Sequence, residues 1–330
     1  VGRSMGEMVR DRLLKAGNDH LLVPEIGAVV AAACLAHDMG NPPFGHSGED
    51  AIKAFFTRGP GTKLRETLSP EQWSDFTFFD GNANAFRILS HQFKGRRPGG
   101  FALTYTMMAS IVKYPFESVL AQKPKFGFFQ SEKEIYREIA TRLGLVCQSE
   151  NPLRFVRHPL VYLVEAADAI CYQIMAIEDA HKLRILSYDE TRNLYMRFFS
   201  LSSDKQRVQK IEDTFRQVTD PNEQIGYLRA LVIGRLVGEC VDVFFQNEQA
   251  IMQGQFTGSL IQPVAPPTRE ALKHGSDLSI RRIYADSAVV QIELAGYKII
   301  TTLLDHFIDA MMHPSGYCKK VLSLFPEQFL

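Results

Sequence analysis

An excess of charge of either sign is missing from this chain. Lysine and arginine total 37 residues, and so do aspartate and glutamate. Without a net field, the composition does not favour general binding to nucleic acid or to an anionic membrane. Two short basic pairs, Arg96-Arg97 and Arg281-Arg282, are typical of solvated faces. Binding of an anion at one of them is the less common alternative.

Long apolar runs and closely spaced cysteines are missing as well. No uninterrupted apolar run reaches the roughly 18 residues of a membrane-spanning helix, and the first residues do not resemble a signal peptide. The five cysteines are odd in number, widely separated and without the spacing of a zinc site. We therefore expect reduced thiols, a cytoplasmic location and no membrane partner.

What the sequence does have is a helical period along almost its whole length. The chain is 45% hydrophobic over 330 residues, enough to bury a large core. Only SIRRIYADSAVVQIELAG (residues 279–296) could hold strands, and its apolar spacing suits a helix better. Apolar residues already recur at helical spacing from Val1, and the sequence does not begin with an initiator Met. We interpret this as a start inside a helix. The sequence predicts an all-α fold.

Local signals predict some boundaries within this helical pattern. Ser131 and Glu134 have the spacing of a capping box at a helix start. The Gly- and Pro-rich stretch 57–73 predicts a polar, mobile loop. Pro115 is expected to end the helix over LTYTMMASIVKYPF.

The stretch AACLAHDMGNPPFGHSGE (residues 32–49) is the most informative part of the chain. His37 and Asp38 end an apolar helix and are adjacent, so on a continuing helix they would point about 100° apart. Both can reach one metal ion if it lies beyond the helix end. Imidazole nitrogen and carboxylate oxygen suit Mn, Fe, Co, Ni or Zn. An ordinary helix end is the alternative, since a histidine there favours the helix dipole although an aspartate opposes it.

A second pair, His46 and Glu49, follows the Pro-Pro turn. These residues are one helical turn apart and can interact. A histidine beside a carboxylate can be held in one tautomer and kept protonated, as a general acid requires. Alternatively, the pair marks a helix start at which Ser47 caps and Glu49 lies in the favourable first turn.

A third candidate group lies on a long apolar helix. In VEAADAICYQIMAIEDA, the side chains of Glu165, Asp168, Tyr172 and Asp179 recur at helical spacing. Asp168 lies among alanines and isoleucine and is expected to be buried, which is costly for a carboxylate unless it is paired or metal-bound. An acidic stripe alone is more often solvated, but with His37 and Asp38 it predicts a third metal ligand.

The segments HDMGNPPFGHSGE (residues 37–49) and YLVEAADAICY (residues 162–172) resemble the signature segments of the HD superfamily, specifically of deoxyguanosine triphosphate triphosphohydrolases. Weaker similarity in DGNANAFRIL, LTYTMMASIVKYPF and IELAGYKII extends the resemblance over nearly the whole chain. The resemblance implies one HD-domain helical bundle over residues 1–330. Its metal-site core would span 1–185, with additional C-terminal helices over 186–330. The implied reaction cleaves a deoxynucleoside triphosphate into a deoxynucleoside and tripolyphosphate.

The resemblance also implies residue roles. It assigns a divalent metal such as Mg, Mn or Co to His37, Asp38 and Asp168, and catalytic proton transfer to His46 oriented by Glu49. It places Lys113 and Tyr114 at the phosphates, Tyr172 at the sugar, and Asn82, more weakly, in the same pocket. No Walker-type glycine loop is present, so side chains and metal must bind the phosphates.

Two departures from the family pattern stand out. A further histidine ligand of the family belongs to a helix that would precede Val1, so this chain does not contain it. Ala176 stands where relatives often carry an aspartate, which could accept a hydrogen bond from the 3′-hydroxyl. Loss of such a bond to a charged group is worth about 1.5–3 kcal/mol, so we expect altered sugar discrimination.

Two other functions remain open at this level. One is a different HD-type phosphohydrolase acting on a nucleoside monophosphate or cyclic nucleotide, and the other is a non-catalytic nucleotide-responsive or single-strand-binding regulator. A deoxynucleoside triphosphate or single-stranded DNA is a candidate effector. We also expect a homo-oligomer, since Phe and Met residues in the second half suit a subunit interface, although core packing accounts for them equally well.

Overall fold

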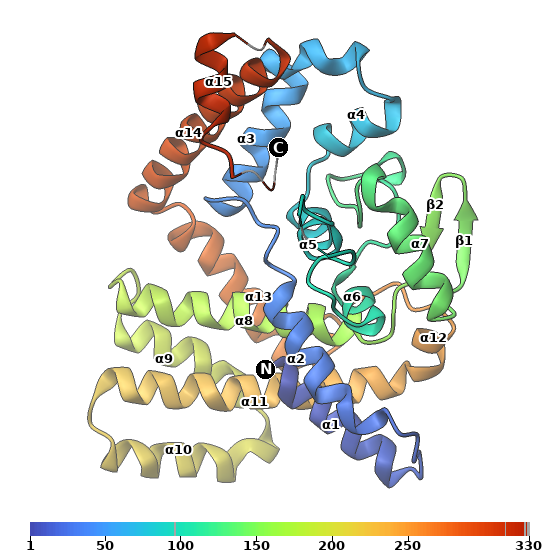
Figure 1. Cartoon of the computed structure of the whole chain (residues 1–330). Coiled ribbons are helices and arrows are strands. Elements are labelled where there is room, and N and C mark those ends of the chain that lie inside the picture. The colour runs from blue at the N-terminus through green and yellow to red at the C-terminus, as the bar shows by residue number, and fades with distance from the viewer. Residues whose placement is uncertain (96, 314, 327, 329–330) are drawn as a thin grey trace. The chain divides into compact units, whose positions relative to one another are not determined.

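The computed structural model describes residues 1–95, 97–313, 315–326 and 328, and helices dominate it (Figure 1). The expected all-α class is confirmed. Arg96, of the first basic pair, lies outside the described residues. The chain divides into two compact units, Val1–Ala31 with Tyr162–Val290 and Ala32–Val161 with Gln291–Leu330. One domain over residues 1–330 stays a prediction.

The first unit is built on the long helix α11 (Pro221–Gln246). Asp220 caps it by accepting a hydrogen bond from the Glu223 amide, and Pro221 occupies the first turn. Its buried residues Ile225, Leu228, Val232 and Leu236 recur every three or four positions, so they form one apolar stripe. Helices α1 (Gly2–Lys15) and α9 (Tyr188–Met196) contact α11. The unit also contains η1 (Val23–Glu25), α8 (Val161–Lys182) from its second residue, η5 (Arg197–Phe199), η6 (Ser202–Asp204), α10 (Lys205–Gln217), α12 (Glu248–Met252), α13 (Pro266–Leu278) and the π-helix Ser279–Ile283.

The second unit has an aromatic core and most of the candidate site. Tyr136 is fully buried, stacks on Phe128 at 4.7 Å and meets Phe86 edge-on at 5.5 Å between ring centroids. Its helices are α3 (Gly45–Arg58), η2 (Pro60–Glu66), α4 (Pro70–Thr77), α5 (Gly81–Ser90), α6 (Tyr105–Ile111), η3 (Ser118–Leu120), η4 (Gln130–Glu132), α7 (Lys133–Arg142), α14 (Ser287–Met312) beyond residue 290 and α15 (Gly316–Leu322). Helix α2 (Ile26–Ala36) runs from the first unit into the second.

The strands of the described chain are β1 (Cys147–Glu150) and β2 (Leu153–Phe155), which pair as an antiparallel hairpin (Figure 1). Leu153 and Phe155 are buried and Arg154 between them is exposed. An alternation of three residues is too short to stand out against the helical period, so the hairpin was not predicted. Residues 279–296, where strands had been the alternative, are helical apart from a short turn.

Two local expectations were wrong. The stretch 57–73 is mostly helical, because it contains the end of α3, all of η2 and the start of α4, which Ser69 and Gln72 cap reciprocally. Ser131 does not cap α7, which begins at Lys133 without a side-chain cap. The Ser131 hydroxyl instead donates to Glu132 and accepts from Arg87, a residue distant in sequence.

Helix α14 is long and apolar enough to cross a membrane, by length and composition alone. Glu293 and Lys298 interrupt its apolar residues, which is why no uninterrupted run was found in the sequence. One such helix is weak evidence for a membrane span.

Asp75 is a buried carboxylate of the second unit with no ion-pair partner among the described residues. It is 3% exposed and accepts hydrogen bonds from the Ser118 hydroxyl at 2.6 Å and the Gln130 amide at 2.7 Å. Burial raises the pKa of Asp75 to about 7, more than these hydrogen bonds lower it. The protonated form is therefore the stable one in the folded protein at mildly acidic pH.

We expect Asp75 to make the fold less stable as pH rises from about 4 to about 7. Between these pH values Asp75 is deprotonated in the unfolded chain but still protonated in the folded protein. The free energy of unfolding therefore falls as pH rises, by up to about 4 kcal/mol across the window. Urea unfolding measured across this range should show that Asp75→Asn, which mimics the protonated acid, removes that part of the slope. Asp50→Asn, at an exposed position of α3, is the control and should keep it. A wild-type slope in Asp75→Asn would contradict the assignment.

Candidate functional site

His37 and Asp38 lie at the C-terminal end of α2. The His37 amide still bonds to the Ala33 carbonyl at 2.9 Å, so the last turn closes at His37 and Asp38 stands beyond it. The His37 Nδ1 lies 2.8 Å from the Cys34 carbonyl oxygen, which can only accept, so Nδ1 carries a proton. In the neutral imidazole Nε2 is then an acceptor, and it faces the Asp38 Oδ1 at 3.3 Å. Two facing acceptors are stable when a cation, either a proton or a metal ion, binds them both.

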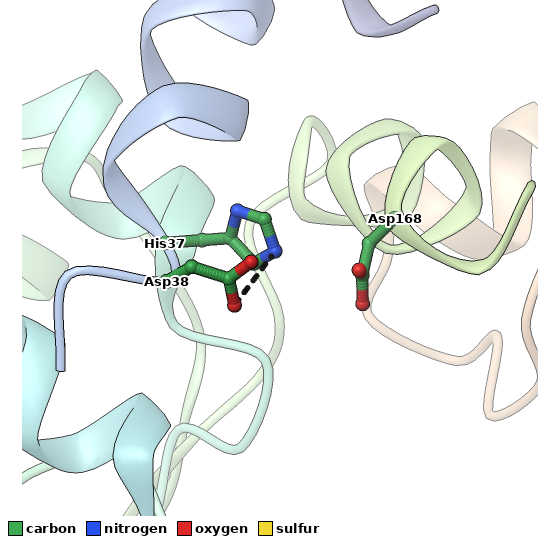
Figure 2. A group of neighbouring side chains, drawn as sticks. All are labelled: His37, Asp38 and Asp168. Atoms are coloured by element: carbon green, nitrogen blue, oxygen red, sulfur yellow. Dashed lines mark ion pairs between the residues drawn. The ribbon is translucent and has the colours of Figure 1, made fainter. Parts of the chain in front are cut away.

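Asp168 supplies the third candidate ligand from α8. It is half-buried, not buried as the surrounding apolar residues had suggested. One ligand atom from each of His37, Asp38 and Asp168 lies within 4.8 Å of the others (Figure 2). One nitrogen and two carboxylate oxygens form a donor set that divalent transition metals and Mg²⁺ accept. The residues therefore fit a divalent cation.

The turn after Asp38 is held against the start of α5. The Asn41 amide group donates to Asp38 Oδ1 at 2.9 Å, and the Asn84 side chain donates to the Gly40 carbonyl at 2.8 Å. A Cβ atom at Gly40 would lie 2.0 Å from the Ala85 amide nitrogen, so only glycine allows this approach. The backbone that carries Asp38 is thereby fixed by α5.

His46 and Glu49 face one another on the first turn of α3. The His46 side chain is 88% exposed, and its Nδ1 lies 3.8 Å from Oε2 of the buried Glu49. The alternative interpretation, in which Ser47 caps this helix, is wrong. The helix begins at Gly45 with Phe44 as its N-cap, and the Ser47 hydroxyl donates to the Glu293 carbonyl of α14. An exposed imidazole backed by a fixed carboxylate can exchange a proton with a bound molecule.

Glu49 is held by two groups that the sequence did not single out. Its Oε1 accepts a hydrogen bond from the Gly81 amide at 2.7 Å, and Lys125 Nζ lies 3.8 Å from its Oε2. The same Nζ donates to Asp80 Oδ1 at 2.8 Å. Burial lowers the pKa of Lys125, but the charges of Asp80 and Glu49 outweigh it and raise the pKa above its ordinary value. Lys125 is therefore a cation next to the catalytic candidate, and no short motif marks it.

Three further sequence candidates lie in the same unit. Asn82 is the second residue of α5, and its side chain donates to Asp80 Oδ1 at 2.9 Å. Lys113 and Tyr114 follow α6, which ends at Ile111, before Pro115. Lys113 Nζ lies 5.6 Å from the centre of the Tyr114 ring, within the range of a cation–π contact. Tyr114 also contributes to the electrostatic environment of Lys125, so these side chains belong to one charged neighbourhood.

Tyr172 lies on α8, one turn after Asp168, and its side chain is exposed. It stacks on Tyr284 with ring centroids 6.0 Å apart and planes 19° from parallel. The sequence did not single out Tyr284, because it lies more than a hundred positions away and in no recognised motif. Two stacked aromatic rings at the surface of the first unit offer a flat apolar face to a ring-containing ligand.

Comparison with known proteins places this chain in a family. A protein of Synechocystis named deoxyguanosinetriphosphate triphosphohydrolase-like is 35% identical over 99% of this chain and 75% of its own length. A Pseudomonas aeruginosa protein of the same name is 34% identical over 96% of this chain and 71% of its own length. The chain belongs to the deoxyguanosinetriphosphate triphosphohydrolase family.

A Yersinia enterocolitica protein named deoxyguanosinetriphosphate triphosphohydrolase, without the suffix, is 29% identical over 95% of this chain. No family model matches the chain. Membership of the triphosphohydrolase family makes the chain a hydrolase. The resemblance first found in two short segments extends over nearly the whole length of the chain.

We expect Asp168→Ala to weaken binding of Mn²⁺ or Co²⁺ more than about 100-fold. Loss of a residue that only orients a ligand costs about 10–100-fold, and Asp168 would be a ligand itself. Calorimetric titration of the metal, together with metal content after dialysis, measures the effect. Asp179→Ala, an exposed position on the same helix, should bind metal as the wild type does. Unchanged metal binding in Asp168→Ala would disprove the metal site.

Proposed function

We propose that this chain hydrolyses deoxynucleoside triphosphates, dGTP among them, to a deoxynucleoside and tripolyphosphate. A divalent cation such as Mg²⁺, Mn²⁺ or Co²⁺ would be held by His37, Asp38 and Asp168. The observation that carries the proposal is the pair of facing acceptors, His37 Nε2 and Asp38 Oδ1, in a member of the triphosphohydrolase family. Such a pair suits a cation, and a triphosphate substrate requires one.

The substrate chemistry explains why the proposed reaction needs cations. A triphosphate repels an incoming water because both are electron-rich, and a bound divalent cation offsets that charge and lowers the pKa of water. Lys113 and Lys125 would add positive charge for the phosphate oxygens, which is useful where charge develops during phosphoryl transfer. The exposed Tyr172–Tyr284 stack would take the flat faces of sugar and base.

His46 is proposed to protonate the departing 5′ oxygen. A deoxynucleoside leaves as an alkoxide, which is a poor leaving group unless it receives a proton. The imidazole is exposed on one side and faces the Glu49 carboxylate on the other, so it can present a proton to a bound substrate. Because Glu49 is buried and bonded to the Gly81 amide, it would keep the orientation of the imidazole constant through the reaction.

We further propose a cytoplasmic location, which the five free cysteines support. A subunit interface on the apolar, exposed positions of α14 would fit the expected homo-oligomer. Ile292, Leu294 and Leu303 are examples of such positions.

If His46 transfers the proton, His46→Ala should lower kcat at least about 100-fold and leave metal affinity unchanged. Glu49→Gln keeps the acceptor for the Gly81 amide and removes the charge, so a milder loss with a shifted pH profile is expected. Steady-state rates with dGTP between pH 6 and 9 measure both. His306→Ala, an exposed histidine on α14, is the control and should be fully active. Loss of metal from His46→Ala would instead make His46 a ligand and refute its proposed role.

The bond that is broken can be determined by isotope labelling. Attack at the α-phosphorus, with the 5′ oxygen leaving, should place ¹⁸O from labelled water in tripolyphosphate and leave the deoxynucleoside unlabelled. Mass spectrometry of both products after one turnover measures this. Orthophosphate or pyrophosphate as the first product would mean that a phosphoanhydride bond is broken and that the bond to the 5′ oxygen is kept. A polyphosphate leaving group needs no proton near neutral pH, so that result would leave His46 without its proposed task.

A further inference from the structure

Phe44, the residue from which α3 starts, has a backbone conformation that residues other than glycine rarely adopt. Its φ is +67° and its ψ is +18°, in the left-handed region. A bulky residue in this region is disfavoured and persists only where its surroundings hold it there. At this point the chain turns from the two prolines at 42–43 into the helix that carries His46. The direction of the first turn of α3 therefore depends on what holds Phe44.

The direction of the His46 imidazole is set mainly by this backbone. The side chain is 88% exposed, and the 3.8 Å between its Nδ1 and the Glu49 Oε2 is longer than a hydrogen bond. A side chain with so little packing of its own points where its backbone directs it. A shift of Phe44, two positions earlier in the chain, would therefore move the imidazole relative to Glu49.

Helix α14 holds Phe44 through Gly296. This part of α14 and α3 lie side by side in the second unit (Figure 1). Gly296 is buried inside α14, where glycine makes a helix less stable than alanine does. A Cβ atom at Gly296 would lie 2.2 Å from Cγ of the Phe44 ring and 2.5 Å from its Cδ2. The ring thus lies directly on the backbone of α14, and a larger residue at position 296 would push it away.

Two further contacts keep α14 against α3 on either side of Gly296. One turn before it, the Glu293 carbonyl accepts a hydrogen bond from the Ser47 hydroxyl at 3.2 Å. One turn after it, Ile300 is buried, and a Cβ atom at Gly48 of α3 would lie 3.1 Å from its Cδ1. Helix α14 therefore cannot move away from the aromatic ring without breaking one of these contacts.

We propose that Gly296 and Phe44 are positioning residues for His46. Gly296 allows the Phe44 ring to lie against α14, the ring holds the left-handed turn, and the turn directs the imidazole toward the departing 5′ oxygen. The inference rests on the proposed proton transfer by His46, but the hold of α14 on His46 can be measured without substrate.

The first test is Gly296→Ala in the whole chain. The added methyl group displaces the Phe44 ring, so kcat for dGTP should fall at least about 10-fold, because a small misplacement of a catalytic group costs up to about 100-fold. The KM for dGTP and the affinity for Mn²⁺ should stay within about 2-fold, since the group that moves acts in the transition state alone.

Gly226→Ala is the matched control. Like Gly296, Gly226 lies inside a helix of 26 residues, but a Cβ atom there meets no other group within 4 Å. Its kcat should stay within about 2-fold of wild type. Equal losses of kcat in the two alanine variants would overturn the proposal, as would a loss of Mn²⁺ affinity in Gly296→Ala as large as its loss of kcat.

Phe44→Gly tests whether Gly296 acts through Phe44. Glycine adopts the left-handed turn without strain but lacks the ring that lies on α14, so the turn is no longer held and kcat should again fall about 10-fold. Adding Gly296→Ala to this variant should change kcat by less than about 2-fold, because the group that it displaces is gone. A wild-type kcat in Phe44→Gly, or equal losses from Gly296→Ala in both backgrounds, would overturn the proposal. Because Phe44→Gly adds no atoms, it serves as the test if circular dichroism shows Gly296→Ala to be unfolded.

A measurement without substrate separates this inference from the proposed reaction. In the NMR spectrum of protein with ¹³C at Cε1 of its nine histidines, the signal missing from His46→Ala belongs to His46. That signal should shift in Gly296→Ala and Phe44→Gly and keep its position in Gly226→Ala. An unmoved His46 signal in the first two variants would overturn the positioning. A shifted signal in a protein whose wild type does not hydrolyse dGTP would overturn the proposed function and leave the hold of α14 on His46 standing.

Discussion

The contact between the start of α5 and the turn after α2 is the constraint on which the candidate site depends. Gly40 lies so close to α5 that a single added carbon would collide with the helix backbone. The Asn84 side chain bonds to the Gly40 carbonyl, and the Gly81 amide bonds to Glu49, nine residues further along the chain. Both ends of this segment are thus fixed to one helical turn. The spacing between the metal candidates and the proton-transfer candidates is set by this close backbone contact together with the two hydrogen bonds.

Charge compensation decides what each buried carboxylate of this unit can do. Glu49 and Asp80 share Lys125, so each of these buried carboxyl groups has a cation beside it. Asp75 has two hydrogen bonds and no cation, and its burial favours the protonated form. A carboxylate that must orient an imidazole has to remain charged across the working pH range. Lys125 supplies a cation beside Glu49, and nothing comparable is found at Asp75 among the described residues.

Local patterns in the sequence were enough to locate the helices and two pairs of site residues. His37-Asp38 and His46-Glu49 are neighbours along the chain, so the end of one helix and the first turn of the next bring each pair together. Asp168 could be predicted as a third metal ligand only in combination with His37 and Asp38, since an acidic stripe alone is more often a solvated face. Lys125 and Tyr284 could not be found in this way, because their partners are far away in sequence. The prediction of Ser131 as a helix cap was wrong for the same reason. Its hydroxyl accepts a hydrogen bond from Arg87, which lies on another helix.

Helix α5 is the element that holds the candidate site of the second unit together. Its first turn supplies the Gly81 amide to Glu49, and Asn84, three residues further on, bonds to the Gly40 carbonyl. Nearer its C-terminal end, Arg87 forms an ion pair with the buried Glu132 of η4, which anchors the helix. A ligand that displaced α5 along its axis would therefore move the hydrogen-bond donor of Glu49 and the support of the Asp38 loop together, since both are attached to the same rigid helix.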